Sequence, residues 1–263
     1  MTLNGWGGRL FDALAAYLSA APPDILCLQE VTSSPETEKP WLTYLDAGLT
    51  LQQRPNLFAE VAALLPDHFG TFCPMTRGTL LDGEVEVPSF WGLATYVRRS
   101  LPVIGQAQGF VHLAYSPDGY GPHPRARSAH VIRVYDHRAA RVVTLAQMHG
   151  LRITGGKHDT PERAVQATRF LDLWRGVAAP GDLSVLCGDF NLEPDSETFR
   201  VFARAGFTEL VTAGGHATTR TSYYKKPGRF ADYMLVDQPD AVTRFDVVTS
   251  PEVSDHCPLV LEI

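Results

Sequence analysis

The sequence lacks the features that mark several specialised classes of protein. Its four cysteines are scattered, and no two stand at the C-x-x-C spacing of zinc sites and redox dithiols. No apolar run approaches the roughly 18 to 20 residues that a membrane-spanning helix needs, and the first residues lack the pattern of a signal peptide. We therefore expect no membrane span, a cytoplasmic location and buried free thiols.

Positive charge is also scarce. The chain has 23 Lys and Arg residues against 29 Asp and Glu residues, which gives a formal net charge of −6. This balance weighs against a protein that binds nucleic acid through a broad basic face. It leaves a nuclease open, because a bound divalent cation and a few local arginines can supply the positive field.

The composition is that of a globular protein with a substantial core. Apolar residues make up 44% of the 263 residues, and charged residues make up 20%. The chain shows no internal repeat, low-complexity stretch or linker. We therefore expect a single domain that spans residues 1–263.

Residue periodicity and turn signals predict a mixture of strands and helices. Helices are expected at residues 9–20, 58–65, 161–180 and 196–205. Strands are expected at residues 1–3, 24–30, 90–98, 103–113, 126–135, 141–149, 183–187, 231–236, 242–248 and 257–263. Residues 32–56 are polar and predict a loop or a short helix. An α/β (α+β) domain with two packed sheets and outer helices accounts for this pattern.

Polar side chains stand where several predicted strands end. Asn4 follows a short strand fragment, Glu30 ends an apolar strand, and His149 ends the strand at residues 141–149. An acid at such a place is either exposed or buried at considerable cost unless it is paired or metal-bound. A lone histidine is more often structural, so the interpretation of His149 depends on its neighbours.

Asp189 and Asn191 leave another predicted strand together, in the segment Gly188-Asp189-Phe190-Asn191. A carboxylate there could orient or deprotonate water, and the amide could bind phosphate. The alternative is an Asx turn, because Asp and Asn favour such corners for purely local hydrogen bonds.

Two further acids and a histidine begin strands near the end of the chain. Asp255 could ligate a metal, and His256 could donate to phosphate or act as a general acid or base. Asp232 could orient His256 by accepting its second ring proton. The alternatives are a surface acid beside a structural histidine, and an ordinary aspartate at a strand entry.

Taken together, these segments resemble the endonuclease/exonuclease/phosphatase superfamily, which includes DNase I-like and exonuclease III-like nucleases, neutral sphingomyelinases and inositol polyphosphate phosphatases. The matching segments, in order, are Leu3-Asn4, Leu28-Gln29-Glu30-Val31, Met148-His149-Gly150-Leu151, Gly188-Asp189-Phe190-Asn191, Ala231-Asp232-Tyr233 and Ser254-Asp255-His256-Cys257-Pro258-Leu259. The third segment is closest to uncharacterised bacterial branches. The resemblance implies a DNase I-like, four-layered α/β/β/α sandwich with two central mixed β-sheets flanked by helices.

The resemblance also implies a divalent-metal site. Glu30 would be the main ligand, with Asn4 and Asp255 close to the metal or its waters. Mg²⁺ is the implied metal, which is consistent with hard oxygen ligands, and Mn²⁺ would substitute for it.

The catalytic roles follow from the same resemblance. Asp189 would position or deprotonate the attacking water, and Asn191 would hold that water or a phosphoryl oxygen. His149 and His256 would stabilise the charge that develops on phosphate, and Asp232 would orient His256. The implied enzyme is a metal-dependent hydrolase that breaks a phosphodiester or phosphomonoester bond.

Three residues are candidates for binding the substrate. Arg127 falls where relatives place an arginine, and Arg125 competes for that role. Trp91 lies near the place where several nucleases of the family have a tyrosine, and it could form a wall of a small-molecule pocket with Tyr120.

The substrate itself stays open. The acidic net charge and the aromatic loops favour a small molecule or a nucleotide. The first alternative is a nuclease acting on DNA or RNA, whose groove would be lined by Arg125, Arg127, Arg220, Lys225 and Lys226. The second alternative, from another class, is a non-catalytic binding module that keeps the fold. The oligomeric state stays open as well.

Overall fold

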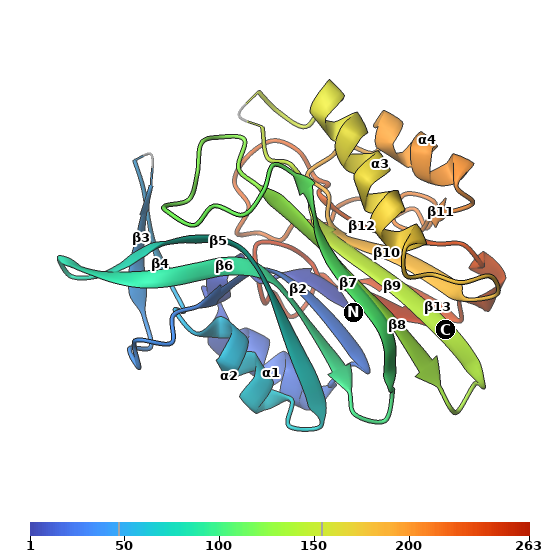
Figure 1. Ribbon diagram of the computed structural model, residues 1–263, viewed down its shortest axis with the longest axis horizontal. Coiled ribbons are helices and arrows are strands. Elements are labelled where there is room, and N and C mark those ends of the chain that lie inside the picture. Colours follow the sequence, from blue (N-terminus) through green and yellow to red (C-terminus); the bar gives the residue numbers. More distant parts are fainter. Residues whose placement is uncertain (47, 154) are drawn as a thin grey trace.

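Two β-sheets lie face to face in the computed structural model, which describes residues 1–46, 48–153 and 155–263. Helices cover the outer face of each sheet, so the layers run α/β/β/α (Figure 1). This is the DNase I-like sandwich that the resemblance predicted.

The first sheet has the strand order β13-β14-β1-β2-β6-β5-β3-β4. Its strands are β1 (Thr2–Asn4), β2 (Ile25–Ser33), β3 (Leu42–Asp46), β4 (Leu49–Gln53), β5 (His68–Asp82), β6 (Val85–Arg98), β13 (Arg244–Val247) and β14 (Leu259–Glu262). The second sheet has the order β11-β12-β10-β9-β8-β7. Its strands are β7 (Val103–His112), β8 (Arg127–Asp136), β9 (Arg141–His149), β10 (Leu183–Asp189), β11 (Thr208–Glu209) and β12 (Asp232–Val236).

Each sheet is covered by a pair of helices that bury an apolar stripe. On the first sheet, α1 (Phe11–Ala20) and α2 (Leu57–Leu64) contribute Leu14 and Val61 to the core. On the second sheet, α3 (Pro161–Arg175) and α4 (Glu197–Arg204) contribute Phe170 and Phe202. Two 3-10 helices, η1 (Trp6–Gly8) and η2 (Pro239–Ala241), complete the described elements. None of the helices in the described part of the chain is long and apolar enough to cross a membrane.

Three expectations about secondary structure are wrong. Residues 32–56 were expected to form a loop or short helix, but their described part contains the end of β2 and the paired strands β3 and β4, while residue 47 lies outside the described residues. Strand β5 was not expected at all. Strands β3 and β4 carry polar residues such as Thr43 and Gln52 at the edge of the sheet, which hides their period. In β5, Gly70 and Pro74 interrupt the apolar pattern. The helix α3 ends at Arg175, before the expected Pro180.

Strand pairing places the polar strand ends at one end of the sandwich. In the parallel pair β9–β10, Asp189 stands opposite His149, and in the antiparallel pair β10–β12 it stands opposite Asp232. In the first sheet, Asn4 stands opposite Gln29 of the parallel neighbour β2. Parallel strands end at the same edge of a sheet, so residues far apart in sequence meet there.

A buried network of hydrogen-bonded polar side chains joins the two sheets just below that end. The Gln29 side-chain amide donates to Gln147 Oε1 at 2.8 Å, and the Gln147 amide donates to Thr95 Oγ1 at 2.7 Å. These side chains have at most 1% of their surface exposed. Because a buried amide without a partner is costly, this network of side chains fixes how the sheets face each other. All four cysteines are buried and free, as expected.

Candidate active site

Asp189 lies at the centre of the polar cluster. Its Oδ2 accepts from Asn4 Nδ2 at 3.0 Å, and its Oδ1 accepts from the backbone N–H of Asn191 at 3.0 Å. His149 Nε2 and His256 Nε2 lie 3.7 and 3.8 Å from Oδ2. Burial alone would raise the pKa of this carboxyl, but His256, His149 and Arg220 hold it well below the usual range. Asp189 is therefore an ionised acceptor at neutral pH.

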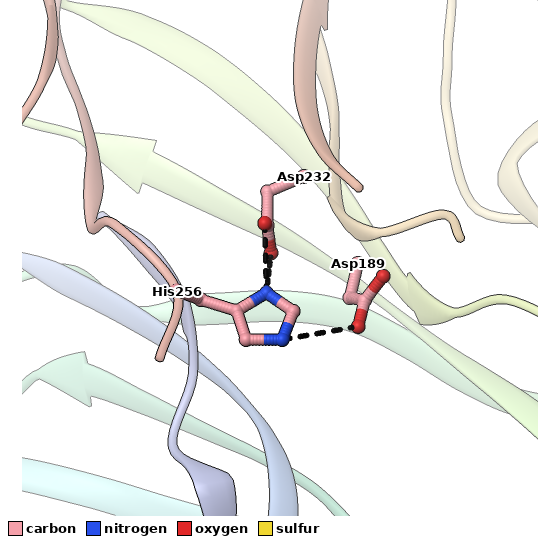
Figure 2. A group of neighbouring side chains, drawn as sticks. All are labelled: Asp189, Asp232 and His256. Atoms are coloured by element: carbon pink, nitrogen blue, oxygen red, sulfur yellow. Dashed lines mark hydrogen bonds and ion pairs between the residues drawn. The ribbon is translucent and has the colours of Figure 1, made fainter. Parts of the chain in front are cut away.

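His256 and Asp232 form a hydrogen-bonded pair beside Asp189 (Figure 2). His256 Nδ1 lies 2.8 and 2.9 Å from the two carboxylate oxygens of Asp232. Burial lowers the pKa of His256, but Asp232 and Asp189 outweigh burial and raise it. Burial also raises the pKa of Asp232. The ring is thus held in one orientation, with Nδ1 toward Asp232 and Nε2 toward Asp189.

Arg220 closes the cluster on the side of His256. Its Nη1 contacts His256 Nε2 and lies 3.5 Å from Asp255 Oδ2. A guanidinium can only donate, so Nε2 accepts in this arrangement and Nδ1 carries the ring proton. From the sequence, Arg220 was expected only as one of the basic residues that would line the groove of a nuclease. It stands in a loop with no periodic pattern, so a position beside His256 could not be predicted.

His149 and Arg127 face Asp189 from the neighbouring strands β9 and β8. Burial, together with the charge of Arg127, lowers the pKa of His149 to about 3, so its ring is neutral at physiological pH. Arg127 is 7% exposed, and its Nε donates to the carbonyl of Gly150 at 2.8 Å. Burial lowers its pKa to about 10, against the attraction of Glu30 and Asp189. Arg127 is thus a desolvated cation beside two carboxylates.

Glu30 is on the opposite sheet, where β2 has a bulge between Leu28 and Val31. Its backbone lies in the left-handed region, with φ at 54°, a conformation that non-glycine residues adopt uncommonly. Its Oε1 lies 4.0 Å from His149 Nε2, and 30% of the side chain is exposed. Within the described residues the carboxylate accepts no hydrogen bond, so its oxygens are free for a ligand.

Asp255 is the second acid with oxygens near the surface of the cluster. Its side chain is 14% exposed, and Oδ1 lies 3.8 Å from His256 Nε2. Burial raises its pKa, and the nearby negative charge of Glu30 raises it further. The repulsion between Asp255 and Glu30 is the kind that a divalent cation relieves.

Asn191 supports the loop that follows Asp189. Like Glu30, it has a left-handed backbone, with φ at 54°. Its side-chain amide is 3.4 Å from the carbonyl of Gly150, and its own carbonyl accepts from Arg163 Nη2 at 3.1 Å. The local turn that the sequence offered as an alternative is present, since Asn191 N–H bonds to Asp189 Oδ1. The turn and the cluster therefore coexist.

Arg125 and Trp91, two of the residues expected to bind substrate, stand apart from this cluster. Arg125 Nη2 pairs with Asp46 at 2.6 Å, and its Nη1 donates to Tyr44 at 2.9 Å. Trp91 packs against Tyr44 and Tyr120, with ring centroids 5.3 and 5.9 Å apart. Arg127, rather than Arg125, is the arginine that reaches the polar cluster.

Lys157 is a cation that the sequence reasoning did not select. Its Nζ donates to the carbonyl of Phe230 and lies 5.9 Å from the ring of Tyr224. Burial and Arg220 lower its pKa, while Asp189 and Asp232 act in the opposite direction. The pKa of Lys157 thus depends on the charges of the cluster. The sequence feature that could have pointed to Lys157 is its position in residues 150–158, a stretch without Asp or Glu.

Comparison with known proteins supports what the geometry indicates. The model of the Endonuclease/Exonuclease/phosphatase family matches residues 1–256, so the chain belongs to this family. Members of the family are hydrolases of phosphate esters and generally depend on divalent metals. No curated protein sequence matches the chain.

Solved structures share the fold at low sequence identity. A family member from Leptotrichia buccalis is 16% identical, with a TM-score of 0.65, over 100% of this chain and 97% of that chain. The mannosyl-6-phosphatase of Bacteroides thetaiotaomicron is 15% identical, with a TM-score of 0.61, over 98% and 91% of the two chains. TDP2 of D. rerio, complexed with single strand DNA product, is 15% identical, with a TM-score of 0.63, over 99% and 97%. These likenesses show the fold alone.

Proposed function

We propose that the protein is a Mg²⁺-dependent phosphoesterase that hydrolyses a phosphate ester of a small molecule or a nucleotide. The observation that carries this proposal is the buried constellation around Asp189, with Asn4 at 3.0 Å and the two histidines at 3.7 and 3.8 Å. Hydrolysis of a P–O bond requires a positioned water and donors for the phosphoryl oxygens. The cluster offers a carboxylate that can position water and side chains that can donate to phosphoryl oxygens.

Asp189 is the group proposed to position or deprotonate the attacking water. Its ionised carboxylate has Asn4 on one oxygen and the Asn191 N–H on the other, which fixes the plane of the carboxylate. Asn191 holds the water or a phosphoryl oxygen from the same loop. The low pKa of Asp189 keeps the carboxylate ionised over the physiological range, so it can accept a hydrogen bond from the water.

Two histidines and an arginine are proposed to bind the phosphoryl oxygens. His256 is oriented by Asp232, and its pKa is raised by Asp232 and Asp189 against burial. Once protonated, its Nε2 would leave Arg220 and donate to a phosphoryl oxygen instead. The neutral His149 donates one N–H, and Arg127 supplies a fixed positive charge. Such preorganised donors act most strongly in a site shielded from water.

The donor set near Glu30 fits a hard divalent cation. Glu30, Asp255 and Asn4 offer oxygens, and the repulsion between the two acids favours a cation between them. Asp189, Asp232 and His256 also bring ligand atoms within 4.8 Å of one another, but the His256 nitrogens are already engaged by Asp232 and Arg220. We therefore assign the metal to Glu30. When bound, Mg²⁺ supplies Lewis-acid polarisation of the phosphate.

Hydrolysis of bis(p-nitrophenyl) phosphate and p-nitrophenyl phosphate with Mg²⁺ tests the proposal. Wild-type protein should release p-nitrophenolate, and Asp189→Asn and His256→Ala should lower kcat by at least roughly a hundredfold. Variants that hydrolyse both esters as fast as an active wild type would refute the assigned roles.

A further inference from the structure

The loop that leads into β12 differs in charge from the rest of the protein. Residues 210–231 contain four basic residues and no Asp or Glu, although the whole chain has a net charge of −6. The basic residues are Arg220, Lys225, Lys226 and Arg229. The same loop also contains Tyr223 and Tyr224, which directly precede Lys225 and Lys226.

Both ends of this loop are fixed to the candidate active site. At the start, Arg220 contacts His256, and the Thr219 hydroxyl oxygen accepts from the backbone N–H of Asp232 at 3.2 Å. At the end, the carbonyl of Phe230 accepts from Lys157. The tip of the loop, residues 222–229, therefore stands at the rim of the site.

Two aromatic rings meet between the tip and the first strand. Trp6 follows Asn4 by two residues, Tyr223 follows Arg220 by three, and their ring centroids are 6.0 Å apart at an interplanar angle of 59°. The backbone N–H of Trp6 donates to Asn4 Oδ1 at 3.0 Å. The φ of Trp6 is 50°, in the left-handed region. A bulky residue adopts that conformation only where its surroundings enforce it. The ring pair is thus tied closely to two residues of the site.

The ring pair combines free aromatic surface with nearby positive charge. Tyr223 is 46% exposed, and the Arg9 guanidinium lies 4.1 Å from the Trp6 ring centre. Lys225 and Lys226 are exposed and form no salt bridge within the described chain. Three acids face the loop. Glu252 accepts from the Ser222 N–H and hydroxyl, Glu193 Oε1 lies beside Gly228, and Asp255 Oδ2 lies 3.5 Å from Arg220 Nη1. Aromatic faces surrounded by basic side chains bind nucleotides, because bases stack on the rings and the cations attract phosphate.

We propose that Trp6 and Tyr223 form a stacking subsite for the nucleobase of a nucleotide-bearing phosphate ester. The proposal rests on the phosphoesterase function above, with the reacting phosphate at Asp189 and His256. Tyr223 offers the exposed ring face, and Trp6 holds that ring at the rim. A sugar phosphate or alkyl phosphate leaves the rings uncovered, so the subsite selects nucleotides among esters that the same chemistry can cleave.

Two chromogenic diesters separate this subsite from the chemistry. Thymidine 5′-(p-nitrophenyl phosphate) and methyl p-nitrophenyl phosphate share the leaving group and differ in the nucleoside. With Mg²⁺, wild type should prefer the thymidine ester by roughly tenfold in kcat/KM, within the range of a single base–aromatic stack. Tyr223→Ala should bring the ratio close to one, and Tyr223→Phe, which keeps the ring, should retain the preference.

Phe69→Ala is the matched control, since Phe69 is a 54% exposed ring with Arg99 at 4.0 Å and belongs to no site. It should leave the ratio unchanged. A wild type that cleaves both esters equally well would overturn the subsite while leaving the phosphoesterase proposal intact. The same conclusion would follow if Tyr223→Ala kept the full preference.

A titration without turnover keeps the two proposals apart. Isothermal titration calorimetry with AMP and with ribose 5-phosphate should show roughly tenfold tighter binding of AMP by wild type. The difference should vanish in Tyr223→Ala. If no ester is hydrolysed, the phosphoesterase proposal fails, and equal affinity for the two ligands would independently overturn the stacking subsite.

Discussion

Strand β10 has a buried aspartate at each end, and the two carboxylates have opposite surroundings. Asp182, just before the strand, accepts from Arg133 Nε at 2.7 Å and Nη2 at 2.9 Å, from Thr144 Oγ1 at 2.7 Å and from the Ala179 N–H at 2.9 Å. Burial would raise its pKa, but Arg133 and the other donors lower it to about 2. The carboxylate thus accepts four hydrogen bonds, three at Oδ2 and one at Oδ1.

Asp189, at the other end, is equally buried but less completely paired. It accepts two hydrogen bonds, and the histidine nitrogens at 3.7 and 3.8 Å are too far away to form more. Burial raises the pKa of Asp232 and of Asp255, and the negative charge of Asp189 raises both further. A carboxylate with all its partners stabilises the fold, whereas one that is left short of partners among other charges is available for chemistry.

The largest effect is expected at the metal ligand beside Asp189. Glu30→Gln removes the charge that holds the cation, so kcat for bis(p-nitrophenyl) phosphate should fall by at least roughly a hundredfold. Isothermal titration with Mg²⁺ and with Mn²⁺ should show weakened binding. Glu84→Gln, in the exposed turn before β6, is the control and should bind both metals normally.

Two outcomes of that titration would contradict the assignment. Unchanged metal binding by Glu30→Gln would move the metal to the Asp189, Asp232 and His256 group. Absence of metal binding by the wild type would favour a non-catalytic binding module that keeps the fold.

At the Asp182 end, the expected effect is on stability. Asp182→Asn removes charge-assisted hydrogen bonds and should lower the free energy of unfolding by about 2 kcal/mol near pH 7. The folded pKa lies below the unfolded one, so this stabilisation is complete above about pH 4 and is lost as the pH falls through about 2. Urea unfolding between pH 7 and pH 2 measures the difference, which should shrink on acidification.

The exposed Asp240→Asn is the control for that series and should match wild type at every pH. If Asp182→Asn unfolded with the wild-type free energy at pH 7, the claim that Asp182 stabilises the fold would be contradicted.

Strand ends were the most predictable part of this site. An apolar run that stops at Asp189 or His149 marks the end of a strand, because a buried acid or imidazole without partners is unfavourable. Glu30 does not end its strand, because β2 continues to Ser33 beyond the bulge between Leu28 and Val31. The resemblance added the order of these residues. The registers that set Asp189 opposite both His149 and Asp232 could not be predicted, since strand pairing depends on contacts between distant segments.

Residues outside strands were harder to predict. Lys157 acts from a loop, and the role of Arg220 beside His256 depends on how a long connection folds back on the site. The paired strands β3 and β4 were missed because edge strands tolerate polar residues and give a weak alternating pattern. The sign of the charge in residues 210–231 was visible in the sequence, but its place at the rim was not.

The most direct test of the functional assignment compares Asp189→Asn and Asp182→Asn under identical conditions, with hydrolysis and urea unfolding measured on the same samples. We predict that Asp189→Asn loses at least roughly a hundredfold in kcat while its stability falls by less than that of Asp182→Asn. Asp182→Asn should lose stability and keep its kcat at a temperature where it is folded. The opposite pattern, with an active Asp189→Asn, would contradict the assignment of Asp189 as the residue that activates water.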